Sequence, residues 1–211
     1  MHGRFRTDPD GARVSPRALA LPALLLAGLA GCAGPRGLAL PEMADWEARR
    51  AALADLTEWE FRGRVAVRVA DEGFNGRLRW WQRNDIYLGT VSGPFGAGTV
   101  RIQGDGNEMS ITDEEGAVTE MEDAEAVLRR RYGWAIPVQS LRYWALGIPD
   151  PGMPAATQFG EDGLLERLEQ GQWVVALDEY MQGGGQPMPR RMTATQADTR
   201  VRIVIDTWIF Y

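Results

Sequence analysis

Residues 61–103 contain successive stretches in which apolar and polar side chains alternate, separated by short turn sequences. In residues 61–69, phenylalanine, glycine and valine alternate with arginine and alanine. In residues 74–82, Leu78 and Trp80 fall on one face, and Arg77 and Arg79 fall on the other. Such alternation is typical of strands with one buried face. Because the turns are too short for crossover connections, the pattern predicts an antiparallel meander.

The rest of the chain predicts a mostly β fold with a few helices. Apolar residues between Met43 and Leu56 recur at helical spacing. Further helices are expected over 123–132, with Gly133 closing it, and from Pro137 to about Pro149. We expect a short strand at 108–112, a loop at 149–160, a hairpin of 163–169 with 173–177, a connector at 183–189, and a last hairpin of 190–194 with 200–206.

A turn rich in glycine lies between the alternating segments at 86–91 and 99–103. It contains Ser92 to Gly98, with Pro94, Phe95 and Gly96 at its centre. Glycine permits positive φ and proline fixes φ, so this stretch is expected to be a surface turn. Phe95 is then either an apolar probe held out in solvent or a side chain that folds back onto the core.

The N-terminus predicts export and lipid attachment. Residues 1–31 read as a removable signal peptide whose apolar region, 18–29, is too short to span a bilayer. The sequence Leu29-Ala30-Gly31-Cys32 resembles the bacterial lipobox, in which the cysteine is lipidated. The alternative is a plain secretory signal followed by an incidental cysteine. The long n-region also leaves open a start further downstream, for instance at Val14. We expect 32–42 to be a lipidated tether and 43–211 to be a single domain.

Composition excludes several kinds of chemistry. The only histidine is His2, the only cysteine is Cys32, and the chain has no lysine. After processing, catalysis by Ser-His-Asp or Cys-His and metal binding by histidine or cysteine are therefore excluded. Removal of residues 1–31 takes away four arginines and two aspartates, so the formal charge changes from −6 to −8. This charge argues against nucleic-acid binding and against electrostatic attraction to anionic lipid.

Attachment to a membrane must then come from acyl chains on Cys32. Ala33 follows this cysteine. An aspartate at that position resembles a signal for retention in the inner membrane of bacteria, so its absence indicates the outer membrane.

Several motifs occur in the order seen in the LolB family of bacterial outer-membrane lipoproteins. They are 61–69, 76–80, Gly93-Pro94-Phe95-Gly96, 123–128, 137–149 and Asp206-Thr207-Trp208-Ile209. The resemblance extends from Trp46 to Ile209. It implies a mostly β fold with α: an unclosed antiparallel β-barrel, or half-barrel, with a helical lid over an apolar cavity.

The same resemblance implies a function without enzymatic activity, cofactor or metal. The protein would be a monomer that is lipid-anchored on the periplasmic face of the outer membrane. It would accept lipoproteins from the periplasmic carrier LolA and insert them into the inner leaflet. Its partners would be this carrier, the acyl chains of the cargo, and outer-membrane lipid. Phe95 matches a loop position where the family typically has a leucine needed for insertion.

Large apolar side chains are expected to line the cavity. Our candidates are Trp80, Trp134, Trp144 and Leu146. Each of them could equally be ordinary core.

Two other functions stay open. The first is a different half-barrel lipoprotein that carries or chaperones lipid or glycolipid and lacks an insertion loop. The second is a hydrolase that uses paired carboxylates, for which Glu114, Glu115, Glu120, Glu122 and Asp123 form the densest cluster. Acidic residues around a turn and a helix start have an ordinary role there.

Overall fold

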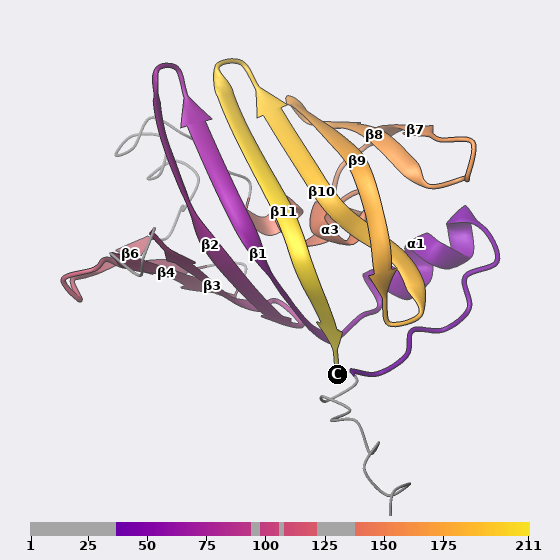
Figure 1. Ribbon diagram of the computed structural model, residues 1–211, viewed down its shortest axis with the longest axis horizontal. Helices are drawn as coiled ribbons and strands as arrows, with labels where there is room; N and C mark the ends of the chain where they lie inside the picture. The colour runs from indigo at the N-terminus through magenta and orange to yellow at the C-terminus, as the bar shows by residue number, and fades with distance from the viewer. Residues whose placement is uncertain (1–36, 94–97, 106–107, 122–137) are drawn as a thin grey trace, which may run out of the picture. The chain divides into compact units, whose positions relative to one another are not determined.

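The computed structural model describes residues 37–93, 98–105, 108–121 and 138–211, which belong to one compact unit of residues 36–211. Eleven antiparallel strands form a single sheet (Figure 1). The strands are β1 (Glu58–Val69), β2 (Glu72–Arg83), β3 (Ile86–Ser92), β4 (Thr99–Gly104), β5 (Met109–Thr112), β6 (Val118–Met121), β7 (Ala155–Phe159), β8 (Leu165–Gln170), β9 (Trp173–Gly183), β10 (Gln186–Gln196) and β11 (Thr199–Phe210). The described helices are α1 (Trp46–Ala54) and α3 (Val138–Leu146).

Two meanders make up the sheet and meet at its centre. The strand order is β6-β5-β4-β3-β2-β1-β11-β10-β9-β8-β7, so the last strand pairs with the first. In the described chain β6 and β7 lie at opposite edges and do not pair. The sheet is therefore unclosed, which confirms the expected half-barrel.

The central pair of strands depends on a glycine. β1 and β11 pair from Trp59 opposite Phe210 to Val69 opposite Thr199, with an irregularity between Arg62 and Gly63. A Cβ atom at residue 63 would lie 2.1 Å from a backbone oxygen of β11. Only glycine permits this close approach of the two backbones.

Both helices pack on one face of the sheet, which we call the inner face. Asp45 caps α1 by accepting a 2.9 Å hydrogen bond from the Ala48 amide. α1 then contacts β10 through Arg49, whose guanidinium donates to the Pro187 carbonyl at 2.5 Å. α3 also packs against β10. In Figure 1 both helices lie behind the sheet. They confirm the helices expected near 43–56 and after Pro137, whereas the one expected over 123–132 lies outside the described residues.

The sequence underestimated the extent of the strands. Residues 155–159 form β7 instead of a loop, because β8 supplies their backbone hydrogen-bond partners. The expected connector at 183–189 is mostly strand, since β9 ends at Gly183 and β10 begins at Gln186. Only Gly184 and Gly185, with φ of 59° and 81°, form the turn. β6 was not expected.

Candidate functional site

The inner face of the two central strands carries a ladder of aromatic rings. Trp59 and Phe61 come from β1, and Trp208 and Phe210 from β11. The Trp208 ring centroid lies 5.4 Å from that of Phe61 and 5.7 Å from those of Trp59 and Phe210. All four side chains are buried. This end of the inner face, where the C-terminus lies, is therefore closed by packed side chains.

Trp80, one of the predicted cavity residues, belongs to the same packed region. Its ring stacks on Tyr87 at 5.2 Å, and its Nε1 donates to Gln82 at 3.1 Å. Only 3% of Trp80 is exposed. Burial, with a smaller contribution from Asp105, raises the pKa of Tyr87 to about 12. The phenol therefore stays uncharged within this apolar environment.

The two other described cavity candidates come from α3. Trp144 is buried and its ring lies 6.0 Å from that of Trp173 at the start of β9. Leu146 is also buried and faces a pocket described below. The fourth candidate, Trp134, lies outside the described residues. The three described candidates are therefore all buried, one on β2 and two on α3, and their contact with a bound acyl chain stays a prediction.

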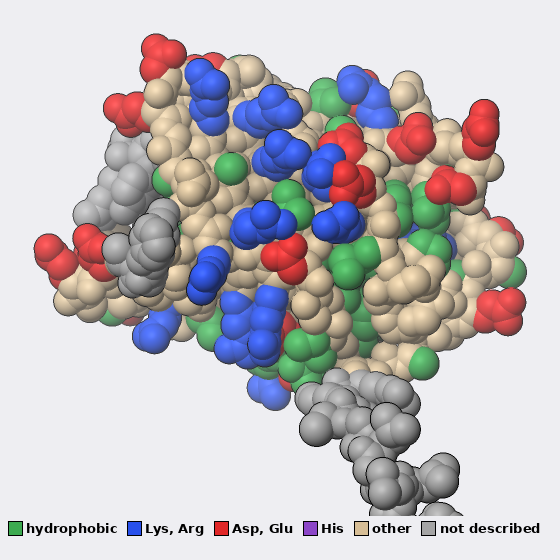
Figure 2. All heavy atoms as spheres, in the orientation of Figure 1, with side chains coloured by type: hydrophobic (Ala, Val, Ile, Leu, Met, Phe, Trp, Pro, Cys, Tyr) green, Lys and Arg blue, Asp and Glu red, His purple; other side chains and the backbone are tan. Residues whose placement is uncertain are grey.

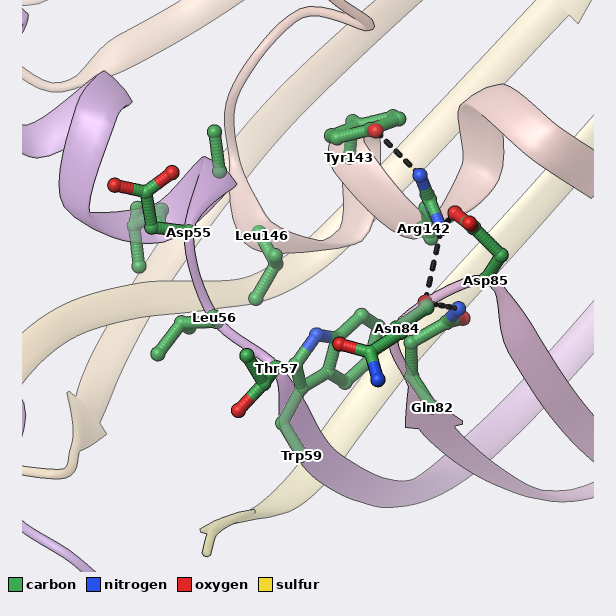
Figure 3. A pocket seen from close by; sticks show the side chains of 12 residues that line it. Asp55, Leu56, Thr57, Trp59, Gln82, Asn84, Asp85, Arg142, Tyr143 and Leu146 are labelled. Atoms are coloured by element: carbon green, nitrogen blue, oxygen red, sulfur yellow. Dashed lines mark hydrogen bonds and ion pairs between the residues drawn. The ribbon is translucent and has the colours of Figure 1, made fainter.

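A small pocket of about 240 Å³ lies between α1, α3 and the turn that joins β2 to β3 (Figure 3). Leu56, Trp59 and Leu146 contribute apolar walls. Arg142 lines the polar side, where it donates to the Asn84 carbonyl at 2.9 Å and to Asp85 at 2.8 Å. This pocket combines apolar walls with a charged rim.

α1 is held in place by a buried charge. Arg49 is 5% exposed, and desolvation lowers the pKa of its guanidinium, with nearby Tyr180 opposing the effect. Burial raises the pKa of Tyr180, whose hydroxyl donates to the Leu165 carbonyl at 2.7 Å. At the outer end of the helix, Trp46 meets Phe159 of β7 edge-on at 4.8 Å. The hydrogen bond of Arg49 to the Pro187 carbonyl of β10 allows this charged side chain to be buried.

Incompletely covered apolar side chains occupy the opposite end of the inner face. Val91 and Val100 pair across β3 and β4, and Val69 and Phe74 lie near the tip of the β1–β2 hairpin. Val91 and Val69 are half-buried, whereas Phe74 and Val100 are 41% and 37% exposed. They share the inner face with packed residues such as Val67, which pairs with Phe74. We call these four residues the open apolar end.

Val91 and Val100 belong to the alternating segments found in the sequence, at 86–91 and 99–103, but the sequence did not single out any of these four residues. Strand periodicity reports which face a side chain occupies and says nothing of how far other elements cover it. No signal in the sequence distinguishes Val91 from a core valine.

The predicted loop starts beside the open apolar end. Its base is closed by a 3.1 Å hydrogen bond from the Gly93 amide to the Gly98 carbonyl, and by a 3.2 Å contact between the hydroxyls of Ser92 and Thr99. Gly98 has φ of 65°, which favours glycine. Pro94, Phe95 and Gly96 lie outside the described residues, as does Cys32. Their roles stay predictions.

The described part of the acidic cluster is exposed to solvent. Glu114 and Glu115 lie in the turn between β5 and β6, and Glu120 is exposed on β6. Asp113 shapes that turn by accepting hydrogen bonds from the amides of Glu115 and Ala117. The described residues contain no group of three or more acidic, histidine or cysteine side chains that could hold a metal ion. Neither described helix is long and apolar enough to cross a bilayer.

An unclosed antiparallel sheet with helices on one face and an apolar inner surface defines a half-barrel fold. The fold is similar to that of a LolA-superfamily protein from Nitrosomonas europaea, with a TM-score of 0.50, 6% identity, and coverage of 74% of this chain and 87% of that one. It is also similar to a DUF1329 family protein from Desulfovibrio piger, with a TM-score of 0.51, 7% identity, and coverage of 77% and 89%.

Sequence comparison assigns the family within this fold class. The family model described as "Outer membrane lipoprotein LolB" matches residues 57–208. Outer-membrane lipoprotein LolB of Chromohalobacter salexigens is 31% identical over 88% of this chain and 87% of its own length. The LolB of Nitrosococcus oceani is 32% identical over 88% of this chain and 92% of its own length. The chain belongs to the LolB family, as the order of its motifs indicated.

Proposed function

We propose that the protein is lipidated at Cys32, resides at the periplasmic face of the outer membrane, and receives lipoproteins from a LolA-type carrier. It then inserts them into the inner leaflet of that membrane. Membership of the LolB family and the names of its relatives, outer-membrane lipoproteins, support this assignment. It works as a transport protein, with no enzymatic step.

The observation that carries the proposal is the uneven covering of the inner face. One end is filled by stacked aromatic rings, whereas Val91, Val100 and Phe74 remain partly exposed at the other. An acyl chain in water has a high free energy, because each exposed methylene costs about 0.8 kcal/mol. The acyl chain would first contact the side chains of the open apolar end. The acyl chain would then pass between the sheet and the helices.

The position of the loop supports a separate role in release. Gly93 and Gly98 hold its two ends together next to Val91 and Val100. A phenylalanine at the tip would enter the apolar part of the bilayer while cargo leaves the inner face. Phe95 is the proposed inserting residue, with Pro94 and Gly96 shaping the tip. The sequence contains no P-loop pattern for ATP binding, so transfer runs toward the higher affinity of the bilayer.

An assay in two steps tests this proposal: transfer of a lipoprotein from the carrier to the protein, and then from the protein to liposomes. Phe95→Glu should accept a lipoprotein from the carrier nearly as well as the unchanged protein, but should fail to deliver it to liposomes, since a carboxylate resists leaving water. Phe95→Leu is the matched control and should complete both steps, because leucine and phenylalanine gain similar free energy on burial. If Phe95→Glu fails at acceptance, or completes both steps, the loop is not the insertion element.

The same assay separates the alternative of a half-barrel carrier without insertase activity. Such a protein would bind acyl chains in its inner face and would not deliver a lipoprotein to liposomes. Its behaviour would also be insensitive to substitution of Phe95. Delivery by the unchanged protein excludes this alternative.

A further inference from the structure

Arginine side chains gather on the outer face of the four central strands, opposite the helices (Figure 2). Strand register places several directly opposite one another, including Arg64 with Arg77 and Arg68 close to Arg200. Like charges in such positions destabilise a sheet. We call the following nine residues the arginine face: Arg62, Arg64, Arg68, Arg77, Arg79, Arg190, Arg191, Arg200 and Arg202.

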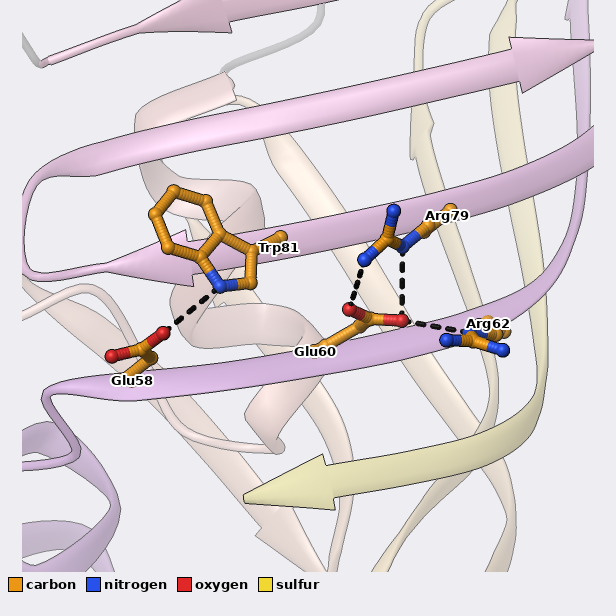
Figure 4. Close-up of polar contacts among 5 residues, drawn as sticks. All are labelled: Glu58, Glu60, Arg62, Arg79 and Trp81. Carbon is orange, nitrogen blue, oxygen red and sulfur yellow. Dashed lines mark hydrogen bonds and ion pairs between the residues drawn. The ribbon is translucent and has the colours of Figure 1, made fainter. Parts of the chain in front are cut away.

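Carboxylates neutralise only part of this surface. Glu60 accepts hydrogen bonds from Arg62 at 2.7 Å and from Nη2 and Nε of Arg79 at 2.7 and 3.0 Å (Figure 4). The other ion pairs are made by Asp206 with Arg64 and by Glu179 with Arg190 and Arg191. Within the described residues, no ion pair involves Arg68, Arg77, Arg200 or Arg202. The arginine face therefore carries excess positive charge on a chain whose net charge is −6.

The face is hollowed where these arginines converge. A surface hollow of about 600 Å³ is lined by Arg64, Arg77, Arg190, Arg191 and Arg202. Arg191 also has a buried Nε atom that lacks a hydrogen-bond partner among the described residues. A buried donor without a partner is costly, and guanidinium forks match the oxygens of phosphate. The hollow has the chemistry of a site for phosphate-bearing groups.

The hollow also reaches the base of the proposed insertion loop, because Gly93 is one of its lining residues. Contact of that loop with a bilayer would bring neighbouring parts of the outer face to the level of the lipid phosphates. An acidic protein surface could also pair with these arginines. It would not explain why the hollow that they line extends to Gly93, at the base of the loop. This continuity favours a lipid surface as the occupant.

We propose that the arginine face binds the phosphodiester groups of anionic phospholipids, and that it docks the body on the inner leaflet with the loop turned toward the lipid. This inference rests on the proposed function for the role of the loop, but the lipid contact itself is measurable without any transfer of cargo. The acidic net charge predicted no such attraction. Acidic side chains occupy turns, as Asp71, Asp113 and Asp162 do, whereas strand alternation concentrates arginines on one face.

Vesicle flotation measures this contact directly. The mature body would be released from its anchor by Cys32→Ala and exported with another signal peptide, since residues 36–211 form a compact unit. Vesicles of phosphatidylcholine alone are compared with vesicles in which a third of the lipid is phosphatidylglycerol. Binding should require the anionic lipid and weaken as salt rises, because exposed charges are screened.

Arg77→Gln combined with Arg202→Gln should lower the affinity for anionic vesicles about tenfold to thirtyfold. This estimate follows because each basic residue near a charged membrane contributes roughly 1 kcal/mol to binding. Arg50→Gln combined with Arg167→Gln is the matched control, because it removes the same charge from α1 and β8. The control should bind like the unchanged body. Circular dichroism should show that both double variants are folded.

Four outcomes would overturn the proposal. The body could bind neutral vesicles as well as anionic ones, it could bind neither, or both double variants could lose affinity equally. If Arg77→Gln with Arg202→Gln instead abolishes acceptance from the carrier and leaves vesicle binding intact, the face belongs to the carrier. Failure of the proposed function would look different, because lipoprotein delivery would be absent while anionic vesicles still bound the body.

Discussion

The indole Nε1 of Trp144 donates a 2.8 Å hydrogen bond to the side-chain oxygen of Gln170, which joins α3 to the end of β8. The same oxygen accepts from the Asp150 amide at 2.9 Å, and the Gln170 nitrogen donates to the carbonyls of Asp150 and Met153. All four hydrogen-bonding positions of this amide are thereby used, at a residue only 1% exposed. Gln170 fixes α3 and the segment after it to the sheet.

Gln170→Met is therefore expected to destabilise the fold. It keeps the volume but removes the hydrogen-bond partner of the buried Trp144 indole and of the partly buried backbone groups of Asp150 and Met153, at a total cost of about 3 kcal/mol. Urea unfolding measures the loss of free energy. Gln158→Met, on the exposed part of β7, is the control and should change stability by less than about 0.5 kcal/mol. Equal effects of the two substitutions would contradict an anchoring role.

The open apolar end should bind cargo at little cost to stability. Val91→Glu places a charge on a half-buried inner position and should impair acceptance of a lipoprotein while the fold survives. Thr90→Glu is the matched control, because the neighbouring residue faces the other side, where it pairs with Arg79 and Arg101. Carrier-to-protein transfer and thermal unfolding are measured for both. Normal acceptance by Val91→Glu would exclude this surface from the cargo path.

Trp80→Glu should behave differently from Val91→Glu. Because Trp80 is 3% exposed and stacks on Tyr87, a glutamate there should lower the free energy of unfolding by about 3–5 kcal/mol as well as acceptance. Transfer and urea unfolding are measured together. A loss of acceptance at unchanged stability would show instead that Trp80 faces a space which cargo enters.

The ion pairs of Glu60 predict a pH dependence of stability. Burial by itself raises the pKa of Glu60, but the hydrogen bonds and charges of Arg79 and Arg62 outweigh it and hold the pKa below its ordinary value of 4.5. A carboxyl whose pKa is lower in the folded state stabilises that state above its unfolded pKa. This stability should be lost as the pH falls below 4.5 and through the folded pKa.

Glu60→Gln removes this contribution. At neutral pH it should lower the free energy of unfolding by about 1–3 kcal/mol, less than for a fully buried pair, because both arginines are more than half exposed. Its stability should also vary less with pH below 4.5 than that of the unchanged protein. Glu115→Gln, in an exposed turn, serves as the control. An unchanged acid dependence in Glu60→Gln would show that other carboxylates are responsible.

Loss of the lipid anchor should separate localisation from cargo binding. Cys32→Ala, exported by another signal peptide, should lose its stable anchoring and keep only the salt-sensitive membrane contact of the arginine face. It should still accept acyl chains, because the body has its own core. Cell fractionation tests the localisation, and carrier-to-protein transfer tests the acceptance of lipoprotein. A released body that is folded but cannot accept any lipoprotein would contradict the proposed apolar binding surface.

The sequence by itself determined strands β1 to β5 of the first meander and the face on which their side chains lie. Phe61, Leu78 and Trp80 face inward as their alternation predicted, because consecutive residues of a strand point to opposite sides. It also located the helix after Pro137 and, through the order of its motifs, the family. These features depend on local spacing, which a linear sequence contains.

Only the tertiary structure decided which distant segments meet. The pairing of β1 with β11 joins residues more than a hundred positions apart and places Arg64 near Arg202 of the other meander. It also decided that Trp80 is fully covered whereas Val91 is not, and that the amide of Gln170 is buried. Covering and charge clustering depend on contacts between elements, and strand periodicity is the same for a covered and an uncovered side chain.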